Sequence, residues 1–254
     1  MVIPALCPEG VTPLWTTDQM ESWLVDERLP AWVRTSYSTF VATIRDTAFP
    51  CFYATRAEHK GLIRYLIAAS STEPQVVEHT LEGVYKFLAE AQAGAALQRQ
   101  DNDLLTLVIF FPPEPQVLTV QAYARQAYDF LNALHALDVV PWPEGWPTNP
   151  YTPGWSYALG GRALFVNVST PANHQRRSRN LGPGLTMIVS LSDAVYSKAG
   201  GPDSLINRRV QQYDSLPPHP NLLISLSDHK PGATVTLYAL PDDNDSELPF
   251  VFHF

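Results

Sequence analysis

At residues 104–111 the chain reads Leu104-Leu105-Thr106-Leu107-Val108-Ile109-Phe110-Phe111, an almost continuously apolar run. A strand that is exposed on one face alternates apolar and polar residues, whereas a strand covered on both faces does not need to alternate. The run therefore predicts a central strand of a sheet, with other elements packed on both of its sides.

Helical and extended segments alternate on either side of this run. Apolar residues at helical spacing and first-turn residues such as Pro74 and Thr119 predict helices at 30–46, 74–88, 119–137 and about 203–214. Short apolar runs predict further strands at 62–69, 155–159, 163–169, 185–191 and 234–240. The proline-rich segment 141–155 is expected to be a loop.

Because the later strands follow one another closely, we expect them to pair antiparallel. The predicted fold class is α+β, a single domain with a mixed, partly antiparallel sheet flanked by helices. This domain is expected to span residues 1–254, with residues 1–29 as an N-terminal extension.

Composition narrows the classes of function. The 254 residues are 45% hydrophobic and 17% charged, as in ordinary globular proteins, and a chain of this length can bury one large core or at most two small ones. No apolar run approaches the roughly 20 residues that span a bilayer, and the first residues lack the features of a signal peptide. We therefore expect a cytoplasmic protein with no membrane partner. A net charge of −8 argues against nucleic acid as a partner.

One basic run stands out against this acidic background. It reads Asn173-His174-Gln175-Arg176-Arg177-Ser178-Arg179-Asn180-Leu181-Gly182-Pro183-Gly184 and follows the predicted strand 163–169. Arginine binds carboxylate or phosphate through paired N–H groups and keeps its charge when partly buried. The run is either a site for a small anion or a basic turn on the surface.

Cys51 is the candidate for a reactive or metal-binding thiol. It lies in Phe49-Pro50-Cys51-Phe52, at a junction between predicted elements, with Arg56, Lys60 and Arg64 close behind. Cations near a thiol lower its pKa, but a free cysteine is also one of the residues most often buried for packing alone. No second cysteine or histidine lies at zinc-site spacing. Both readings, a thiolate and a structural thiol, stay open.

The aromatic loop offers flat apolar surface. Its residues Trp142, Trp146, Tyr151 and Trp155 either cover an edge of the core or form a wall for a planar ligand. A planar ligand, arginine anchors and one thiol together suggest a haem, with the thiolate on the iron and the arginines on the propionates. Nucleotide-binding glycine motifs and the G-x-S-x-G motif of hydrolases do not occur.

Several motifs together resemble the YqcI/YcgG family from about residue 30 to the C-terminus. They are Phe49-Pro50-Cys51 with Ala57, Gly61 and Arg64; Leu164-Phe165-Val166-Asn167 with Thr170-Pro171; Arg177 to Gly184; Arg208, Arg209, Tyr213-Asp214 and Pro218-His219-Pro220; and Leu240-Pro241-Asp242-Asp243-Asn244. The run Arg177-Ser178-Arg179-Asn180-Leu181-Gly182-Pro183-Gly184 is the most specific of them.

The resemblance implies a haem-dependent N-oxygenase of specialised metabolism. Such an enzyme oxidises a guanidino or amino-heteroaromatic nitrogen of a small substrate, for example a 2-aminoimidazole-type amine, with O₂ and an electron donor or with peroxide. The implied cofactor is haem b, with Cys51 as the iron ligand and His174 as the reserve ligand. Residues implied to hold the cofactor are Arg176, Arg177, Arg179, Asn180 and Trp155.

Some segments depart from the family pattern, which affects the expected substrate more than the cofactor. Residues 190–196 and Leu248-Pro249-Phe250 are diverged. A cationic substrate would need a carboxylate, and the candidates are Asp193, Asp214, Asp242 and Asp243. Two other functions remain open: a haem-binding sensor or carrier without turnover, and an iron-free protein that binds an anionic metabolite. A homodimer is kept open as the assembly.

Overall fold

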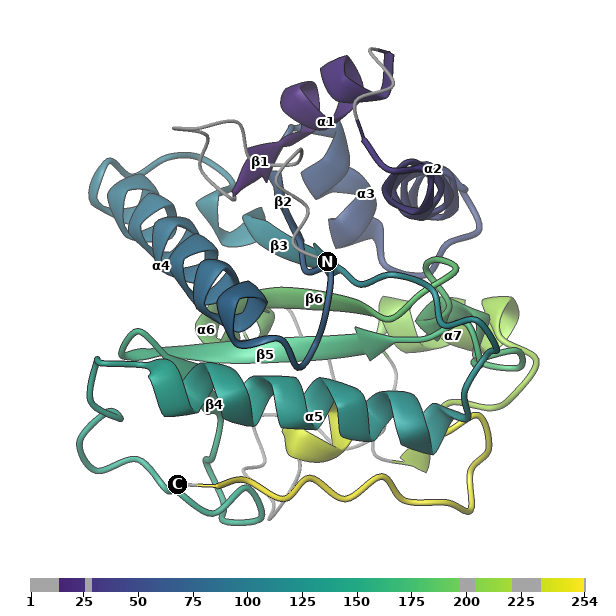
Figure 1. Cartoon of the computed structure of the whole chain (residues 1–254). Helices are drawn as coiled ribbons and strands as arrows, with labels where there is room; N and C mark the ends of the chain where they lie inside the picture. Colours follow the sequence, from purple (N-terminus) through teal and green to yellow (C-terminus); the bar gives the residue numbers. More distant parts are fainter. Residues whose placement is uncertain (1–13, 26–28, 197–203, 221–233, 254) are drawn as a thin grey trace.

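The computed structural model describes residues 14–25, 29–196, 204–220 and 234–253 (Figure 1). These residues form one α+β domain with seven α-helices and a six-stranded mixed sheet, as expected. The strands are β1 Trp15–Thr16, β2 Ile63–Ile67, β3 Thr106–Phe110, β4 Tyr157–Leu159, β5 Arg162–Ser169 and β6 Thr186–Leu191. The helices are α1 Thr17–Val25, α2 Ala31–Arg45, α3 Phe52–His59, α4 Pro74–Ala96, α5 Val120–Leu137, α6 Ser192–Tyr196 and α7 Leu205–Tyr213.

The sheet has the order β1-β2-β3-β6-β5-β4, so β3 lies near its centre. Strand β3 pairs parallel with β2 and antiparallel with β6. Strands β4, β5 and β6 pair antiparallel in succession. The prediction of a central strand and of antiparallel later strands is confirmed.

The two faces of the sheet carry two separate hydrophobic clusters. Alternate residues of β3 point to opposite faces, because successive side chains of a strand do so. Leu107 and Ile109 belong to the cluster beneath α4 and α5, whereas Val108 and Phe110 belong to the cluster beneath α1, α2 and α3. This explains why the run 104–111 is apolar at nearly every position.

The main helices begin where the sequence predicts. Pro74 is the first residue of α4, a position where its missing N–H is not needed. Thr119 precedes α5, and its hydroxyl accepts a hydrogen bond from the backbone N–H of Ala122 at 3.2 Å. In α2 the predicted stripe is buried: Val33, Tyr37, Phe40, Val41 and Ile44.

The expected strand at 234–240 is wrong. Residues Val235–Leu237 form a 3₁₀-helix. The segment contacts the sheet through a backbone hydrogen bond from Val168 N to Tyr238 O at 2.7 Å, and through the Tyr238 hydroxyl, which donates to Leu164 O at 2.7 Å and accepts from Tyr157 N at 3.1 Å. A short apolar run is compatible with a strand or with a buried helical turn. Here most of the residues around Tyr238 are buried, so the sequence lacks the apolar–polar periodicity that would distinguish a strand from a helical turn.

Two further differences lie near the N-terminus. Helix α3 was not expected; it has a weak apolar stripe, with only Ala57 and Glu58 buried. Residues 14–25, the main described part of the predicted N-terminal extension, take part in the fold, since β1 pairs with β2 and Met20 of α1 is buried in the second cluster. None of the helices formed by the described residues has the length and apolarity that crossing a bilayer requires.

Gly184 is placed where a side chain would collide with the backbone. A Cβ atom there would lie 2.5 Å from Phe111 O, whereas at Gly182 the nearest atom would lie at an ordinary 3.6 Å. We expect Gly184→Ala to lower the free energy of unfolding by about 1–3 kcal/mol, because the chain must shift to make room. Urea unfolding measures this, with Gly182→Ala as the control that changes little. Equal stabilities of the two variants would contradict the close approach.

Candidate functional site

A cavity of about 320 Å³ lies over the sheet face that carries the second cluster. This volume falls within the roughly 300–1,000 Å³ of small-molecule and cofactor sites. Helices α2, α3, α6 and α7 contribute to its walls together with β3, β5 and β6. Its lining is mostly apolar, with residues that include Phe40, Ile44, Phe49, Phe165, Leu181, Ile188, Ile206 and Val210.

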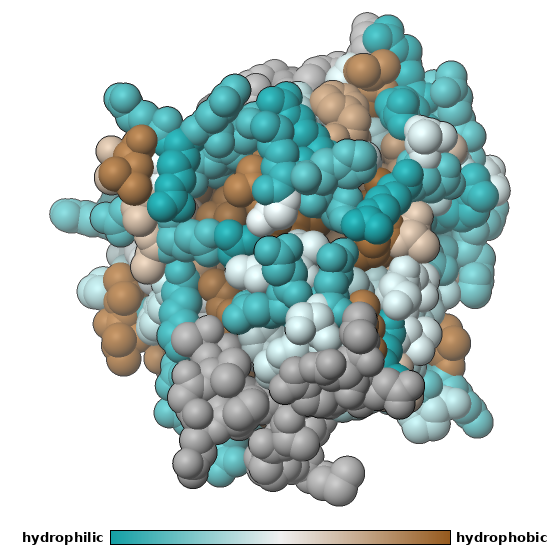
Figure 2. All heavy atoms as spheres, turned by 90° about the horizontal axis from the view of Figure 1, so that it is seen from above, coloured by the Kyte–Doolittle hydropathy of each residue, from teal (hydrophilic) through white to brown (hydrophobic). Residues whose placement is uncertain are grey.

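Figure 2 views the molecule from the side on which α1 and α2 lie at the top of Figure 1. Where this face is not grey, hydrophilic residues predominate, and hydrophobic residues show in recesses between them and in patches at the margins (Figure 2).

Cys51 presents the cavity with a thiol. The residue precedes α3 directly after Pro50, is not disulfide-bonded and lines the cavity. Burial raises the pKa of the Cys51 thiol, and hydrogen bonds from the Ala54 and Tyr53 backbone and the charges of Arg179 and Arg209 offset this in part. A thiol in this environment is neutral unless a cation or metal stabilises its thiolate. The other cysteine, Cys7, lies outside the described residues.

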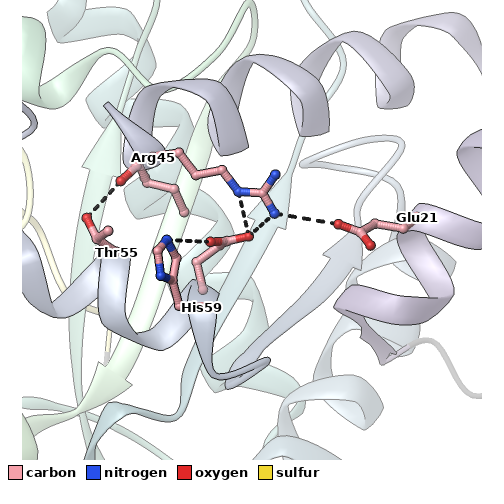
Figure 3. A network of polar contacts seen from close by, with 6 residues as sticks. Glu21, Arg45, Thr55 and His59 are labelled. Atoms are coloured by element: carbon pink, nitrogen blue, oxygen red, sulfur yellow. Dashed lines mark hydrogen bonds and ion pairs between the residues drawn. The ribbon is translucent and has the colours of Figure 1, made fainter. Parts of the chain in front are cut away.

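A buried carboxylate fixes the position of α3, and with it that of Cys51 (Figure 3). The side chain of Glu58 is 2% exposed and forms an ion pair with Arg45, whose Nε donates to Glu58 Oε1 at 2.9 Å. On the same helix, Thr55 Oγ1 donates to Ile44 O at 2.7 Å. These contacts join α3 to the end of α2. Arg45 also forms a longer ion pair with the exposed Glu21, with 3.6 Å between Arg45 Nη2 and Glu21 Oε1.

Arg209 holds the loop before Cys51 from the other side. Its Nη2 donates to the carbonyl oxygens of Thr47 and Phe49, both at 2.6 Å. Because Arg209 belongs to α7, this links α7 to the loop that carries the thiol. The mouth of the cavity is therefore framed by elements far apart in the sequence.

Arg179 is a buried cation with neutral partners. It is 7% exposed, lines the cavity and donates to Tyr238 O at 3.2 Å and to Leu237 O at 3.1 Å. No carboxylate of the described residues forms an ion pair with it, and burial lowers its pKa to about 10, with the charge of Arg176 adding to the effect. A buried charge needs compensation, so the site favours an anion beside Arg179.

Asn167 adds a polar group to the sheet wall of the cavity. It lies on β5 between apolar neighbours and opposite Ile188 of β6. Its Oδ1 atom is buried and has no hydrogen-bond partner among the described residues. A buried acceptor of this kind is destabilising until a donor meets it.

The other two arginines of the basic run do not line the cavity. Arg176 is buried, and its guanidinium donates to Pro241 O at 2.6 Å, to Asp243 O at 2.9 Å and to Asn244. Arg177 is exposed, lies 4.5 Å from the centre of the Tyr213 ring and donates to Tyr213 O at 3.0 Å. Both hold the loop 173–184 to other parts of the chain.

The remaining expected site residues are also elsewhere. His174 is exposed, and its backbone N–H donates to Asp242 Oδ2 at 3.0 Å. Asn180 donates from Nδ2 to Pro171 O at 3.3 Å. Trp155 is buried in the first cluster, beneath the opposite face of the sheet, where it packs on Tyr238 and Phe250.

The expected carboxylates serve the loop rather than the cavity. Asp242 accepts hydrogen bonds from the backbone N–H groups of residues 174–176, and Asp214 accepts from the N–H and hydroxyl of Ser178. Asp243 accepts from Ser246, and Asp193 accepts from the N–H of Ala194. None of the four lines the cavity.

Asn167 was not singled out from the sequence. The signal that could have found it is one polar residue inside the otherwise apolar run Ala163-Leu164-Phe165-Val166-Asn167-Val168. A residue of this type on the buried face of a strand needs a partner. The contribution of α2 carried no comparable signal, because its lining residues Phe40 and Ile44 are ordinary apolar ones.

The residues of the cavity fit a haem. Within the part of the chain that the structure describes, no three His, Cys, Asp or Glu side chains gather in a way that could hold a metal ion. A metal bound at Cys51 would therefore need a group that brings further ligands, as a porphyrin does. The apolar walls suit a porphyrin ring, and Arg179 suits a carboxylate.

Comparison with known proteins gives matches over most of the chain. The model of the YqcI/YcgG family matches residues 40–251. The "Putative N(omega)-hydroxy-L-arginine synthase DcsA" of Streptomyces lavendulae is 28% identical over 201 residues, 76% of this chain and 74% of that protein. Two Bacillus subtilis proteins are "Uncharacterized protein YcgG", 28% identical over 78% of this chain and 79% of its own, and "Uncharacterized protein YqcI", 24% identical over 95% of each. No solved structure matches.

The Glu58 ion pair is expected to stabilise the loop that carries Cys51. Glu58→Gln should lower the free energy of unfolding by about 1–3 kcal/mol, because a buried group loses its charged partner. Glu21→Gln, which changes an exposed carboxylate on the same arginine, should change it by less than about 0.5 kcal/mol. Urea unfolding of the two variants compares them. A Glu58→Gln variant as stable as Glu21→Gln would show that the pair has no such role.

Proposed function

The chain belongs to the YqcI/YcgG family, and we propose that it is a haem-dependent N-oxygenase acting on a guanidino or amino-heteroaromatic nitrogen. The observation that carries the proposal is an apolar cavity lined by the thiol of Cys51 and by the buried cation of Arg179. The similarity to the Streptomyces lavendulae protein, named as a synthase of a hydroxylated guanidino compound, supports the choice of substrate.

Cys51 would hold the haem iron, and Arg179 would bind a carboxylate at the edge of the same cavity. When bound, a haem with a thiolate ligand supplies oxygen activation, because the thiolate donates electron density that favours O–O cleavage. Binding to iron would also remove the obstacle to ionisation of Cys51, since a metal stabilises the thiolate that burial alone disfavours.

The residues of the chain itself would bind, orient and shield the reactants. The apolar side chains of α2, β5, β6 and α7 would exclude water from the reacting nitrogen. Hydroxylation of one N–H group with O₂ takes two electrons and two protons, and yields N–OH and water. The reaction therefore needs an electron donor, or else a peroxide that already carries the two electrons and two protons.

An absorption spectrum of protein expressed with added haem tests the cofactor. The wild-type protein, reduced under carbon monoxide, is expected to show the strongly red-shifted Soret band of thiolate ligation. Cys51→Ser should lose that band, because a hydroxyl does not replace the thiolate. A histidine-type band in the wild type would move the ligand to a histidine, and no haem band at all would make the oxygenase proposal wrong.

Incubation with L-arginine or 2-aminoimidazole, with O₂ and a reductant or with peroxide, tests turnover. We expect a product heavier by one oxygen atom with either substrate, identified by mass spectrometry. A haem-loaded protein that converts neither would point to a sensor or carrier that binds haem without turnover.

Substitution of Arg179 tests the anion site, and the same substitution of Arg177 is the matched control. Arg179→Gln is expected to weaken haem binding roughly tenfold or more, because a charge-assisted contact to a carboxylate is lost. Arg177→Gln should leave it unchanged, since Arg177 is exposed and contacts Tyr213. Haem titration measures both, with thermal unfolding as the check on folding. Equal haem affinities would remove Arg179 from the cofactor site.

A further inference from the structure

We propose that Asn167 binds the nitrogenous head group of the substrate, by accepting a hydrogen bond from one of its N–H groups. This inference rests on the proposed function and extends it, because it names the residue that selects the substrate. The argument starts from the position of Asn167 on the sheet wall of the cavity.

Asn167 faces the cavity because of its place in β5. Residues at alternate positions of the strand share one face. Leu164, Val166 and Val168 are buried in the first cluster, so Phe165 and Asn167 point to the opposite face, where both line the cavity. The pairing of Asn167 with Ile188 and of Phe165 with Ser190 places Ser190 diagonally beside Asn167 on the same wall.

The Oδ1 atom of Asn167 needs a donor that none of the described residues provides. It is buried and unpartnered among the described residues, and the side chains across the cavity are mostly apolar. A buried acceptor without a partner is destabilising, so a ligand that brings an N–H group gains affinity there. A water molecule can occupy the position until the ligand displaces it.

A haem cannot provide this donor. The four ring nitrogens of an iron porphyrin carry no hydrogen, and its ionised propionates only accept hydrogen bonds. The propionates therefore match the cation of Arg179 and not the oxygen of Asn167. If haem occupies the cavity, a second ligand with an N–H group, the substrate, can donate to Asn167 in place of water.

The two polar groups lie on neighbouring parts of the same wall. Ser169, two residues beyond Asn167 on the same face of β5, donates from Oγ to Arg179 O at 2.7 Å. The cavity thus presents a cation and an acceptor oxygen, which suit different groups. The cation of Arg179 suits a carboxylate, whereas the oxygen of Asn167 suits a guanidino or 2-aminoimidazole group, which has several N–H donors in one plane, and disfavours apolar head groups of similar size.

Calorimetric binding of L-arginine and 2-aminoimidazole tests the inference, with L-norleucine as a probe whose side chain has no N–H group. For whichever of the first two binds the wild type, Asn167→Leu should weaken binding by about 10- to 100-fold. Asn167→Asp should retain it, because it keeps an acceptor oxygen. Binding of L-norleucine should be no weaker in Asn167→Leu than in the wild type, because the variant no longer leaves an acceptor unpaired against an apolar side chain.

Ser190→Ala is the control, because it removes a hydroxyl from the same wall and should change the affinity less than threefold. An Asn167→Leu variant that binds as tightly as the wild type would overturn the inference. So would an equal loss in Ser190→Ala, which would assign the effect to the polarity of the wall. Failure of the wild type to bind either nitrogenous probe would also overturn it.

Calorimetry on haem-free and haem-loaded protein separates this inference from the proposed function. Haem binding that gives the thiolate spectrum, together with full affinity in Asn167→Leu, makes the role of Asn167 wrong and leaves the function standing. If the protein takes up no haem but binds the nitrogenous probe through Asn167, the proposed function is wrong and the role of Asn167 stands. The Soret absorbance and thermal unfolding of each variant check that the cavity is intact.

Discussion

Arg176 is 1% exposed, and the geometry of the loop 173–184 depends on how its guanidinium is satisfied. Its donors meet the backbone oxygens of Pro241, Asp243 and Pro217 and the side chain of Asn244. Burying a guanidinium is unfavourable unless its donors are paired. The chain meets this requirement by bringing the segment 241–244 and Pro217, in the segment that follows α7, against one loop.

This arrangement places Arg179 at the cavity. The backbone of the loop is held by Asp242 and Asp214, and the short 3₁₀-helix Arg177–Arg179 follows. Arg179 O then accepts from Ser169 at the end of β5, while its guanidinium reaches the backbone of residues 237 and 238. Arg176 thus contributes to the site through structure, as a positioning residue, whereas Arg179 lines the cavity.

The sequence predicted the sheet better than the site, and the arginines show why. Continuous apolar runs and first-turn residues located β3, β5, β6, α4 and α5, since each signal is local. Three arginines within four positions looked like one cluster. Arg176 precedes the 3₁₀-helix Arg177–Arg179 and has a non-helical backbone, so it does not share the helical spacing of the other two. Within the helix, Arg177 and Arg179 are two positions apart and point in different directions, because three residues complete one turn. The three side chains therefore enter different environments, which contacts with distant segments decide.

The other site residues depend on register and on tertiary contacts. The candidate Cys51 could be named from the sequence, but its place at the cavity follows from the Glu58 ion pair and from Arg209. Asn167 was hidden within an apolar run. The aromatic loop gave a misleading signal, because Trp155 fills the core on the opposite face of the sheet. Aromatic content alone does not distinguish a ligand wall from a packed core.

The 3₁₀-helix Val235–Leu237 also has a bearing on self-association. Strand β4 pairs with β5 only as far as Leu164, which leaves the N–H and C=O groups of the second half of β5 available on that edge. Tyr238 covers part of it by accepting from Val168 N. Uncovered sheet edges are templates for pairing with other chains. The segment around Tyr238 thus covers part of the exposed edge of β5. The backbone oxygen of Tyr238 that accepts from Val168 N also accepts from the guanidinium of Arg179 at the cavity.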